Sequence, residues 1–175
     1  MTQRKPTRWA RLWRGVDPVT RRMLVVALAV LALDRVTKWW VVEAMDLAHL
    51  GRIEVWPPFL NLVMAWNRGI NFGIGAGGPE AMRWLLLGLA VAISAALALW
   101  VRRRAARAGA GPAMPLAWGA GIVIGGALGN AWDRLIYGAV ADFLNMSCCG
   151  IANPYAFNVA DVAIFAGAAL IAWKA

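Results

Sequence analysis

The sequence predicts an all-α polytopic membrane protein with four transmembrane helices in a single membrane domain, residues 1–175. The chain is 61% hydrophobic and 15% charged, whereas soluble proteins are about half apolar and a quarter charged. The apolar stretches 23–42, 81–101, 115–132 and 156–173 each approach the ~17–25 residues that a helix needs to cross a hydrocarbon core. None of them alternates polar and apolar faces as a helix of a soluble bundle does.

Basic residues predict the orientation of these helices. Residues 1–22 hold seven Lys or Arg, and the connection 102–114 holds four more. The two remaining connections, 43–79 and 133–156, hold three between them. Since cytoplasmic connections are enriched in Lys and Arg, both termini and residues 102–114 are expected in the cytoplasm. The net charge of +9 then reflects these cytoplasmic segments, and no nucleic-acid partner is expected. The N-terminal basic segment is expected to rest on anionic lipid headgroups.

The first span, 23–42, is expected to remain in the mature protein. Its apolar run is longer than the ~7–15 residues of a signal-peptide core, and no small-residue cleavage pattern follows it. It ends in LALDRVTKWW, where Asp34 and Lys38 share a helix face. An ionised group within a span costs about 2.5–3.5 kcal/mol and is usually paired. Asp34 and Lys38 are therefore predicted to be structural, as an ion pair or an interhelical hydrogen bond.

Residues 43–79 form a long connection on the outer side. It contains Pro57 and Pro58, and its runs RIEVW and LNLVMAW are typical of strands. The glycine-rich run NRGINFGIGAGG then precedes Pro79 and Glu80, which suit the start of a helix. We therefore predict a small, partly β-structured periplasmic cap between the first and second spans.

The third span, 115–132, carries Gly121, Gly125 and Gly129 at intervals of four residues. Such a row of small residues allows a neighbouring helix to approach closely. The pattern predicts tight helix packing along this face.

Polar residues follow directly on the third span. Asn130, Asp133 and Arg134 are spaced so that they share one helix face. Asp133 and Arg134 could form an ion pair at the interface, or the arginine could polarise a carbonyl group. The residues alone leave both interpretations open.

Two aspartates, Asp142 and Asp161, lie in apolar runs, AVADFL and NVADVA, without a neighbouring cation. Asn158 stands three residues before Asp161, at the start of the fourth span. The simplest arrangement places the two carboxyl groups side by side at the outer interface with one shared proton, because like charges in contact cannot both ionise. Such a pair could activate a water molecule for attack on an amide.

Metal and thiol chemistry are not expected. The chain has one histidine, His49, and two adjacent cysteines, Cys148 and Cys149. These residues make no convincing metal site, so neither a metal nor another cofactor is predicted. Adjacent cysteines are poorly placed for a disulfide, and no base stands nearby to activate a thiolate. The cysteines are therefore interpreted as small apolar residues.

Four sequence blocks resemble those of the bacterial lipoprotein signal peptidase family, also called signal peptidase II or prolipoprotein signal peptidase. In order along residues 34–167 they are DRVTK, NRGINFGIG, GGALGNAWDRLIYGAVADF and FNVADVAIFAG. The resemblance implies that Asp142 and Asp161 form the catalytic dyad of an aspartic peptidase. The implied supporting residues, those that bind substrate or order the site, are Asp34, Lys38, Asn67, Asn130, Arg134 and Asn158, with Asp133 a structural polar residue beside them. One departure is Asn71, which stands where the family usually has a small residue.

The resemblance also implies a reaction and a location. It implies a membrane-embedded aspartic endopeptidase that removes the signal peptide from a diacylglyceryl-modified prolipoprotein, cutting just before the lipidated cysteine. The implied location is the bacterial cytoplasmic (inner) membrane, with the active site at the periplasmic face. The expected partners are this substrate and membrane lipid, and the chain is expected to act as a monomer.

The sequence is also compatible in part with two other classes of function. A small channel or proton carrier would use Asp34, Asp142 and Asp161 as a relay. A relay should spread its ionisable groups across the membrane, whereas Asp142 and Asp161 both fall on the outer side. A non-enzymatic binder of lipidated peptides differs from a peptidase only in lacking an active dyad.

Overall fold

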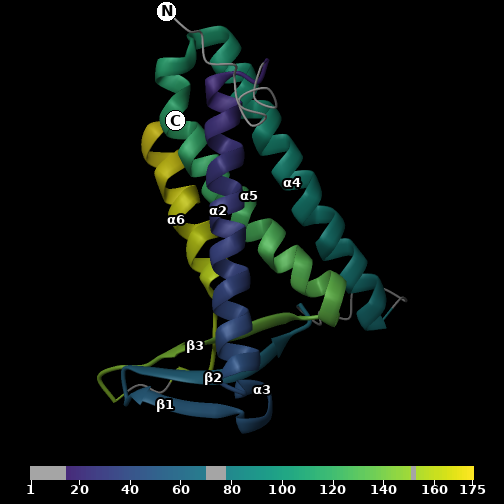
Figure 1. The fold of residues 1–175 in the computed structure, drawn as a ribbon, viewed down its shortest axis with the longest axis vertical. Coiled ribbons are helices and arrows are strands. Elements are labelled where there is room, and N and C mark those ends of the chain that lie inside the picture. The colour runs from purple at the N-terminus through teal and green to yellow at the C-terminus, as the bar shows by residue number, and fades with distance from the viewer. Residues whose placement is uncertain (1–14, 70–77, 151–152) are drawn as a thin grey trace, which may run out of the picture.

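A computed structural model describes residues 15–69, 78–150 and 153–175 of the chain. The described part contains four long helices packed side by side, with a small sheet across one end of the bundle (Figure 1). The long helices are α2 (Pro18–Lys38), α4 (Gly78–Ala108), α5 (Ala110–Tyr137) and α6 (Val159–Lys174). The shorter elements are η1 (Trp39–Ala44), α3 (Leu47–Leu50), β1 (Arg52–Trp56), β2 (Leu60–Asn67) and β3 (Val140–Met146). The predicted mainly helical fold with a small β-structured part is confirmed.

Helix α2 begins at Pro18, before the apolar stretch that starts at residue 23. Asp17 caps it, because its side chain accepts a hydrogen bond from the backbone N–H of Thr20 at 2.9 Å. Pro18 suits the first turn, where no N–H donor is needed. The helical path continues beyond Lys38 as the π-helix η1 and so delivers the chain to the sheet end of the bundle.

Helix α5 is the central helix and packs against α2, α4 and α6. A Cβ atom added at Gly125 would lie 2.6 Å from the carbonyl oxygen of Ala27 in α2. One added at Gly126 would lie 2.5 Å from the carbonyl oxygen of Ala160 in α6. The predicted close packing along this helix is confirmed, and it involves a neighbour on each side.

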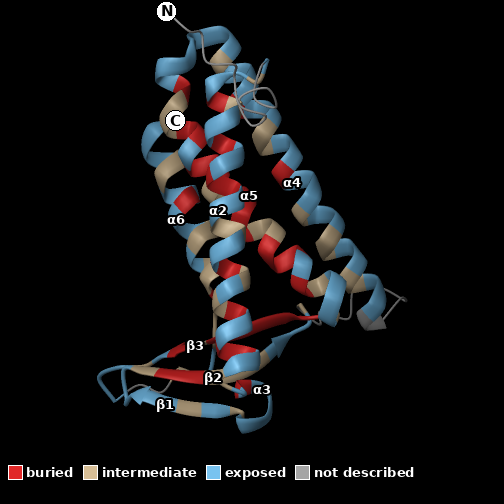
Figure 2. Cartoon of the chain, in the orientation of Figure 1, coloured by how far each residue is buried: buried red, intermediate tan, exposed pale blue. Residues whose placement is uncertain are grey.

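Burial differs between the helices. Figure 2 shows buried residues concentrated along α5 and β3, whereas α4 is mainly exposed. Within the described residues, two segments are long and apolar enough to cross a membrane by length and composition, Glu80–Ala108 and Ala110–Tyr137. Helix α6 has 16 residues, because the chain before Val159 is extended and Phe157 forms an isolated bridge with Leu144.

The sheet is antiparallel in the order β1-β2-β3. Its first two strands match the runs RIEVW and LNLVMAW, as predicted. The third strand, β3, comes from residues outside 43–79 and was not predicted. Strand β3 is buried along most of its length, and a strand covered on both faces lacks the alternation that reveals strands in a sequence. The pairing places Asp142 opposite Ala65 and Val140 opposite Asn67.

Candidate active site

Asp142 and Asp161 come together at the sheet end of the bundle. Asp142 lies on β3 and Asp161 in the first turn of α6. Asn158, which is fully buried, connects them: its side-chain Nδ2 donates to Asp142 Oδ1 at 2.6 Å, and its backbone N–H donates to Asp161 Oδ2 at 3.1 Å. The two carboxyl groups therefore meet around one asparagine.

The local sequence explains the position of Asp161. Asn158 is the N-cap of α6 and accepts a hydrogen bond from the backbone N–H of Asp161 at 2.9 Å. Asp161 returns the bond by accepting from the backbone N–H of Asn158, which completes a capping box. This pairing fixes Asp161 before any substrate is present. The spacing N-x-x-D is the signal from which the cap could have been predicted.

Asn130 on α5 links the two carboxylates to the bundle. Its Nδ2 donates to Asp161 Oδ1 at 2.8 Å. Its Oδ1 accepts from Lys38 Nζ at 3.3 Å and from Asn158 Nδ2 at 3.1 Å. The amides of Asn130 and Asn158 are thus both engaged within the site.

Asn67, the last residue of β2, reaches Asp142 from the other side. Its Nδ2 donates to Asp142 Oδ2 at 3.1 Å, and its Oδ1 accepts from the backbone N–H of Gly69 at 2.9 Å. The second bond fixes which end of the amide faces the carboxyl group. Asn67 is exposed, so it can face both Asp142 and a bound molecule.

Arg134 lies one helical turn beyond Asn130. Its Nη1 donates to the carbonyl oxygen of Asn130 at 3.3 Å, and it is close enough to Asp142 and Asp161 to interact with their charges. It does not form the ion pair with Asp133 that the sequence left open. Asp133 is instead paired with two cations from the first helix, Arg35 and Lys38.

Those cations belong to a charged cluster that we define as Asp34, Arg35, Lys38 and Asp133. Lys38 Nζ lies 3.0 Å from Asp34 Oδ2, so the predicted pairing of these two residues is present. Arg35 was not singled out from the sequence. It could have been found from the run DRVTK, which places a second cation directly after Asp34.

Burial changes the acidity of Asp142. The pKa of its carboxyl is raised from 3.8 to about 6, mainly because the group is removed from water. The nearby charge of Asp161 raises the pKa further, whereas the hydrogen bonds from Asn67 and Asn158 and the charge of Lys38 lower it. Asp142 can therefore take up and release a proton close to neutral pH, as a general acid must.

An apolar groove of about 220 Å³ leads to the two polar residues Asn130 and Arg134. It runs between α4, α5 and α6, and its apolar lining consists of Leu86, Leu89, Ala90, Ile93, Val123, Ala127 and Ile164. A groove of this kind can hold an extended apolar chain with one end beside Asn130 and Arg134.

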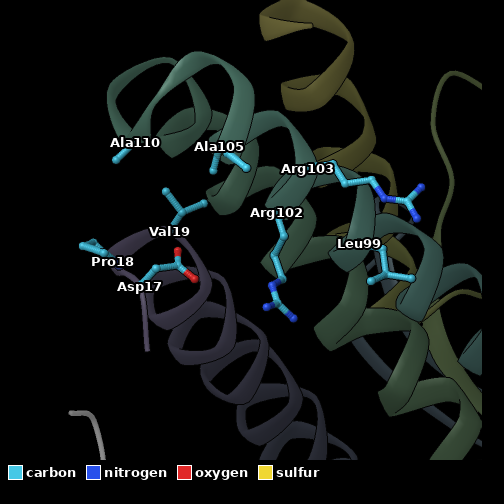
Figure 3. A pocket seen from close by; sticks show the side chains of 9 residues that line it. Asp17, Pro18, Val19, Leu99, Arg102, Arg103, Ala105 and Ala110 are labelled. Atoms are coloured by element: carbon cyan, nitrogen blue, oxygen red, sulfur yellow. The ribbon is translucent and has the colours of Figure 1, made fainter. Parts of the chain in front are cut away.

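A larger cavity of about 530 Å³ lies at the opposite end of the bundle, between the start of α2 and the end of α4 (Figure 3). Its lining includes Asp17, Val19, Leu99, Arg102 and Arg103. Asp17 is the acid in this lining, and it is already engaged as the cap of α2. Among the described residues, the neighbouring carboxyl groups Asp142 and Asp161 lie at the sheet end instead.

Within the described residues, neither the cysteines nor a metal cluster forms part of this site. Among the described residues, no group of three or more His, Cys, Asp or Glu side chains could hold a metal ion. Cys148 and Cys149 are exposed free thiols beyond the end of β3. Asn71 lies outside the described residues, so the departure noted there has no structural account.

Known proteins resemble this chain over most of its length. The sequence profile of signal peptidase (SPase) II matches residues 26–175. A lipoprotein signal peptidase of Rhodopseudomonas palustris is 43% identical over 152 residues, which are 85% of this chain and 87% of the relative. One from Methylobacterium sp. is 42% identical over 146 residues, 83% of each chain.

Solved structures agree with this similarity. A bacterial membrane enzyme determined by the in meso method at 2.3 Å resolution has a TM-score of 0.63 and 28% identity, with 85% of this chain and 84% of that chain covered. A second, at 1.9 Å resolution, has a TM-score of 0.66 and 26% identity, with 86% and 90% covered. On these grounds the chain belongs to the signal peptidase II family, the lipoprotein signal peptidases.

Proposed function

We propose that this chain is a membrane-embedded aspartic endopeptidase that removes the signal peptide from diacylglyceryl-modified prolipoproteins, cutting just before the lipidated cysteine. The observation that carries the proposal is the meeting of Asp142 and Asp161 around Asn158. One carboxyl has a pKa raised to about 6, and the other accepts hydrogen bonds on both oxygens. An acid and a base in one site is what hydrolysis of an amide requires.

The proposed reaction uses one water molecule. Asp161, as carboxylate, takes a proton from the water while the water oxygen attacks the scissile carbonyl carbon. Asp142, in its protonated form, donates to the carbonyl oxygen. The proton held by Asp161 then passes to the leaving nitrogen as the C–N bond breaks, and Asp142 regains its proton from the collapsing intermediate.

The polar residues around the dyad divide into two groups in this proposal. Asn130 and Asn158 hold the dyad, because their amides are engaged with the carboxyl groups. Asn67 and Arg134 face the space where a substrate would lie, and they would bind its backbone or the developing oxyanion. This refines the broader supporting role that the family resemblance implies for all four residues.

The proposed membrane arrangement has four spans, with both termini in the cytoplasm and the sheet and dyad at the periplasmic face of the inner membrane. Large apolar side chains are exposed along α2, α4 and α6, for example Leu28, Leu89 and Phe165. An apolar surface this wide is typical of contact with lipid. The groove beside Asn130 and Arg134 would receive the apolar part of the substrate from the bilayer. One chain supplies every residue of the proposed site, consistent with a monomer.

A proton relay is less well supported. It would need Asp34 to exchange protons, but Asp34 is fully buried and paired with Arg35 and Lys38. A peptide binder without activity shares the groove and must be separated by experiment.

The test is cleavage of a purified diacylglyceryl prolipoprotein by the purified chain in a single-turnover assay. Wild type should release the signal peptide, and Asp142→Asn or Asp161→Asn should reduce the rate by about 10²–10⁴-fold or more, since a general acid or base contributes this much. The double variant should be no slower than either single variant, because the pair acts as a unit. Substrate binding should survive in all three variants.

The results of this assay distinguish an aspartic peptidase from a peptide binder without activity. Near-normal cleavage by either single dyad variant contradicts the aspartic mechanism. Binding without cleavage by wild type leaves the binder as the explanation.

A further inference from the structure

Two buried carboxylates stand directly behind the dyad. Asp34 Oδ1 accepts a hydrogen bond from the backbone N–H of Ala160 at 3.2 Å. Asp133 Oδ2 accepts one from the backbone N–H of Ala141, also at 3.2 Å. Ala160 and Ala141 are the residues immediately before Asp161 and Asp142. Each dyad aspartate is therefore preceded by a peptide group that a buried carboxylate holds.

The two carboxylates are joined to each other by two cations. Arg35 Nη2 lies 2.8 Å from Asp34 Oδ2 and 2.5 Å from Asp133 Oδ1. Lys38 Nζ lies 3.0 Å from Asp34 Oδ2 and 2.6 Å from Asp133 Oδ2. Two positive and two negative charges thus balance in a site where both carboxylates are fully buried. Losing a fully buried member would leave a charge without a partner, which is strongly unfavourable.

Helix packing leaves room for this charged cluster. Gly129 on α5 faces Asp34, and a Cβ atom there would lie 2.6 Å from Asp34 Oδ2. The cluster also reaches the dyad by a side-chain route, since Lys38 Nζ donates to the same Asn130 that holds Asp161. The cluster is therefore fixed to two long helices on one side and contacts both dyad segments on the other.

We propose that Asp34, Arg35, Lys38 and Asp133 act as one positioning unit that sets the separation of the two dyad carboxyl groups. Strand β3 and helix α6 are different elements, and each carries one aspartate. A single ion network holds the peptide groups of Ala141 and Ala160. It therefore fixes β3 and α6 relative to each other. Displacement of a catalytic group by about 1 Å can lower a rate by about 10²-fold. This inference rests on the proposed function. It attributes the spacing of the two dyad carboxyl groups to residues that do not touch the reacting atoms.

Arg35 is the best residue for a test. Its side chain is 23% exposed, so water can enter when it is truncated and the fold is spared. Arg35→Met removes the second bridge between Asp34 and Asp133. Cleavage should show a kcat reduced roughly 10–100-fold with KM within about threefold of wild type, because positioning acts on the chemical step rather than on substrate binding. Arg35→Lys keeps the charge and should recover most of the lost kcat.

Arg83→Met is the matched control. Arg83 is equally exposed, at 22% of its side chain, and it too pairs with an acid, Glu80, and bonds a carbonyl of α5, that of Leu135. It has no contact with the charged cluster, so its kcat should stay within about threefold of wild type. Amide hydrogen exchange supplies a readout apart from activity: exchange at Ala141 and Ala160 should accelerate in Arg35→Met and not in Arg83→Met.

Failure of this inference differs from failure of the proposed function. If wild type cleaves and the dyad variants do not, an unchanged kcat and unchanged exchange in Arg35→Met overturn the positioning role alone. Equal losses in Arg35→Lys and Arg35→Met, or in Arg83→Met, overturn it as well. If Arg35→Met does not fold, Arg35→Gln replaces it, because glutamine keeps a polar group at this partly exposed position and removes the charge, and the same expectations apply.

Discussion

Asn158 makes two contacts that matter for the site, one within α6 and one with the sheet. As the N-cap of α6 it satisfies a free backbone donor of the first turn, and its amide also bonds Asp142 on the sheet. The start of the helix and the position of the dyad are therefore set by the same side chain. The cap of α6 is a local contact, so it could be predicted from the sequence. The hydrogen bond to Asp142 joins two distant segments, so it could not.

The acidity of Asp142 predicts a dependence of stability on pH. Its pKa is raised from 3.8 to about 6 in the folded protein, so the folded state binds more protons than the unfolded state between these values. Stability from this group is complete below about pH 4 and is lost as the pH rises through about 6. Asp142→Asn removes the ionisation, so its melting temperature in detergent should exceed that of wild type at about pH 8, and the difference should shrink at about pH 5.

Glu54→Gln is a suitable control for this measurement, because Glu54 is exposed, pairs with an arginine that does not titrate in this range, and lies outside the proposed dyad. Its melting temperature relative to wild type should not show the gain at high pH. A gain for Asp142→Asn that is larger at about pH 5 than at about pH 8 would have the wrong sign and would contradict burial as the cause.

At the scale of elements, helices were easier to predict than strands. The polar face of α5 followed from the spacing of Asn130, Asp133 and Arg134, because helical periodicity is a local property. Strand β3 was missed, although it carries Asp142, because its partner strand comes from a distant segment and because most of its residues are buried, so it shows no alternation. The cluster partners of Asp133 were missed for the same reason, since Arg35 and Lys38 reach it from another helix.

The contact between α5 and α6 gives a prediction at this scale. Gly126→Ala places a Cβ atom 2.5 Å from the carbonyl oxygen of Ala160, and α6 must move away because backbone cannot yield as a side chain does. Overpacking of this kind costs about 1–3 kcal/mol. The variant should melt at a lower temperature, and cleavage should slow by about 10-fold or more, because Asp161 moves with the first turn of α6.

Gly111→Ala is the control on the same helix. No atom lies within 4 Å of a Cβ added at Gly111, and alanine favours a helix over glycine by about 1 kcal/mol. Its stability should be equal or higher and its cleavage unchanged. If Gly126→Ala and Gly111→Ala had equal effects, helix propensity and not the contact with α6 would explain the effect of Gly126→Ala.

For the whole molecule, composition and the order of apolar stretches predicted a helical bundle with a small sheet, which the structure confirms. What they could not predict is which helix is central. Helix α5 packs against three others and α4 stays largely exposed (Figure 2), and this depends on glycines whose contact partners lie far away in the sequence. Figure 1 shows the sheet at the end of the bundle opposite the start of α2. The cavity lined by the start of α2 and the end of α4 therefore lies far from the sheet.

That separation leads to a prediction about orientation in the membrane. The proposed arrangement puts the sheet outside and the end of α4 inside, as the basic residues of that segment require. Cys148 and Cys149 are exposed near the sheet, so wild-type protein in spheroplasts should react with a membrane-impermeant maleimide. Replacement of both by Ser should abolish labelling and leave cleavage within about threefold of wild type, because neither thiol has an activating base.

In that cysteine-free background, Leu50→Cys and Arg107→Cys report on opposite ends of the bundle. Both positions are exposed, one in α3 beside the sheet and the other at the end of α4. Leu50→Cys should be labelled in spheroplasts, whereas Arg107→Cys should be labelled only after the membrane is opened, because the reagent cannot cross lipid. Labelling of Arg107→Cys in closed spheroplasts would reverse or abolish the proposed four-span orientation, and the dyad would then face the wrong compartment for a substrate that emerges on the periplasmic side.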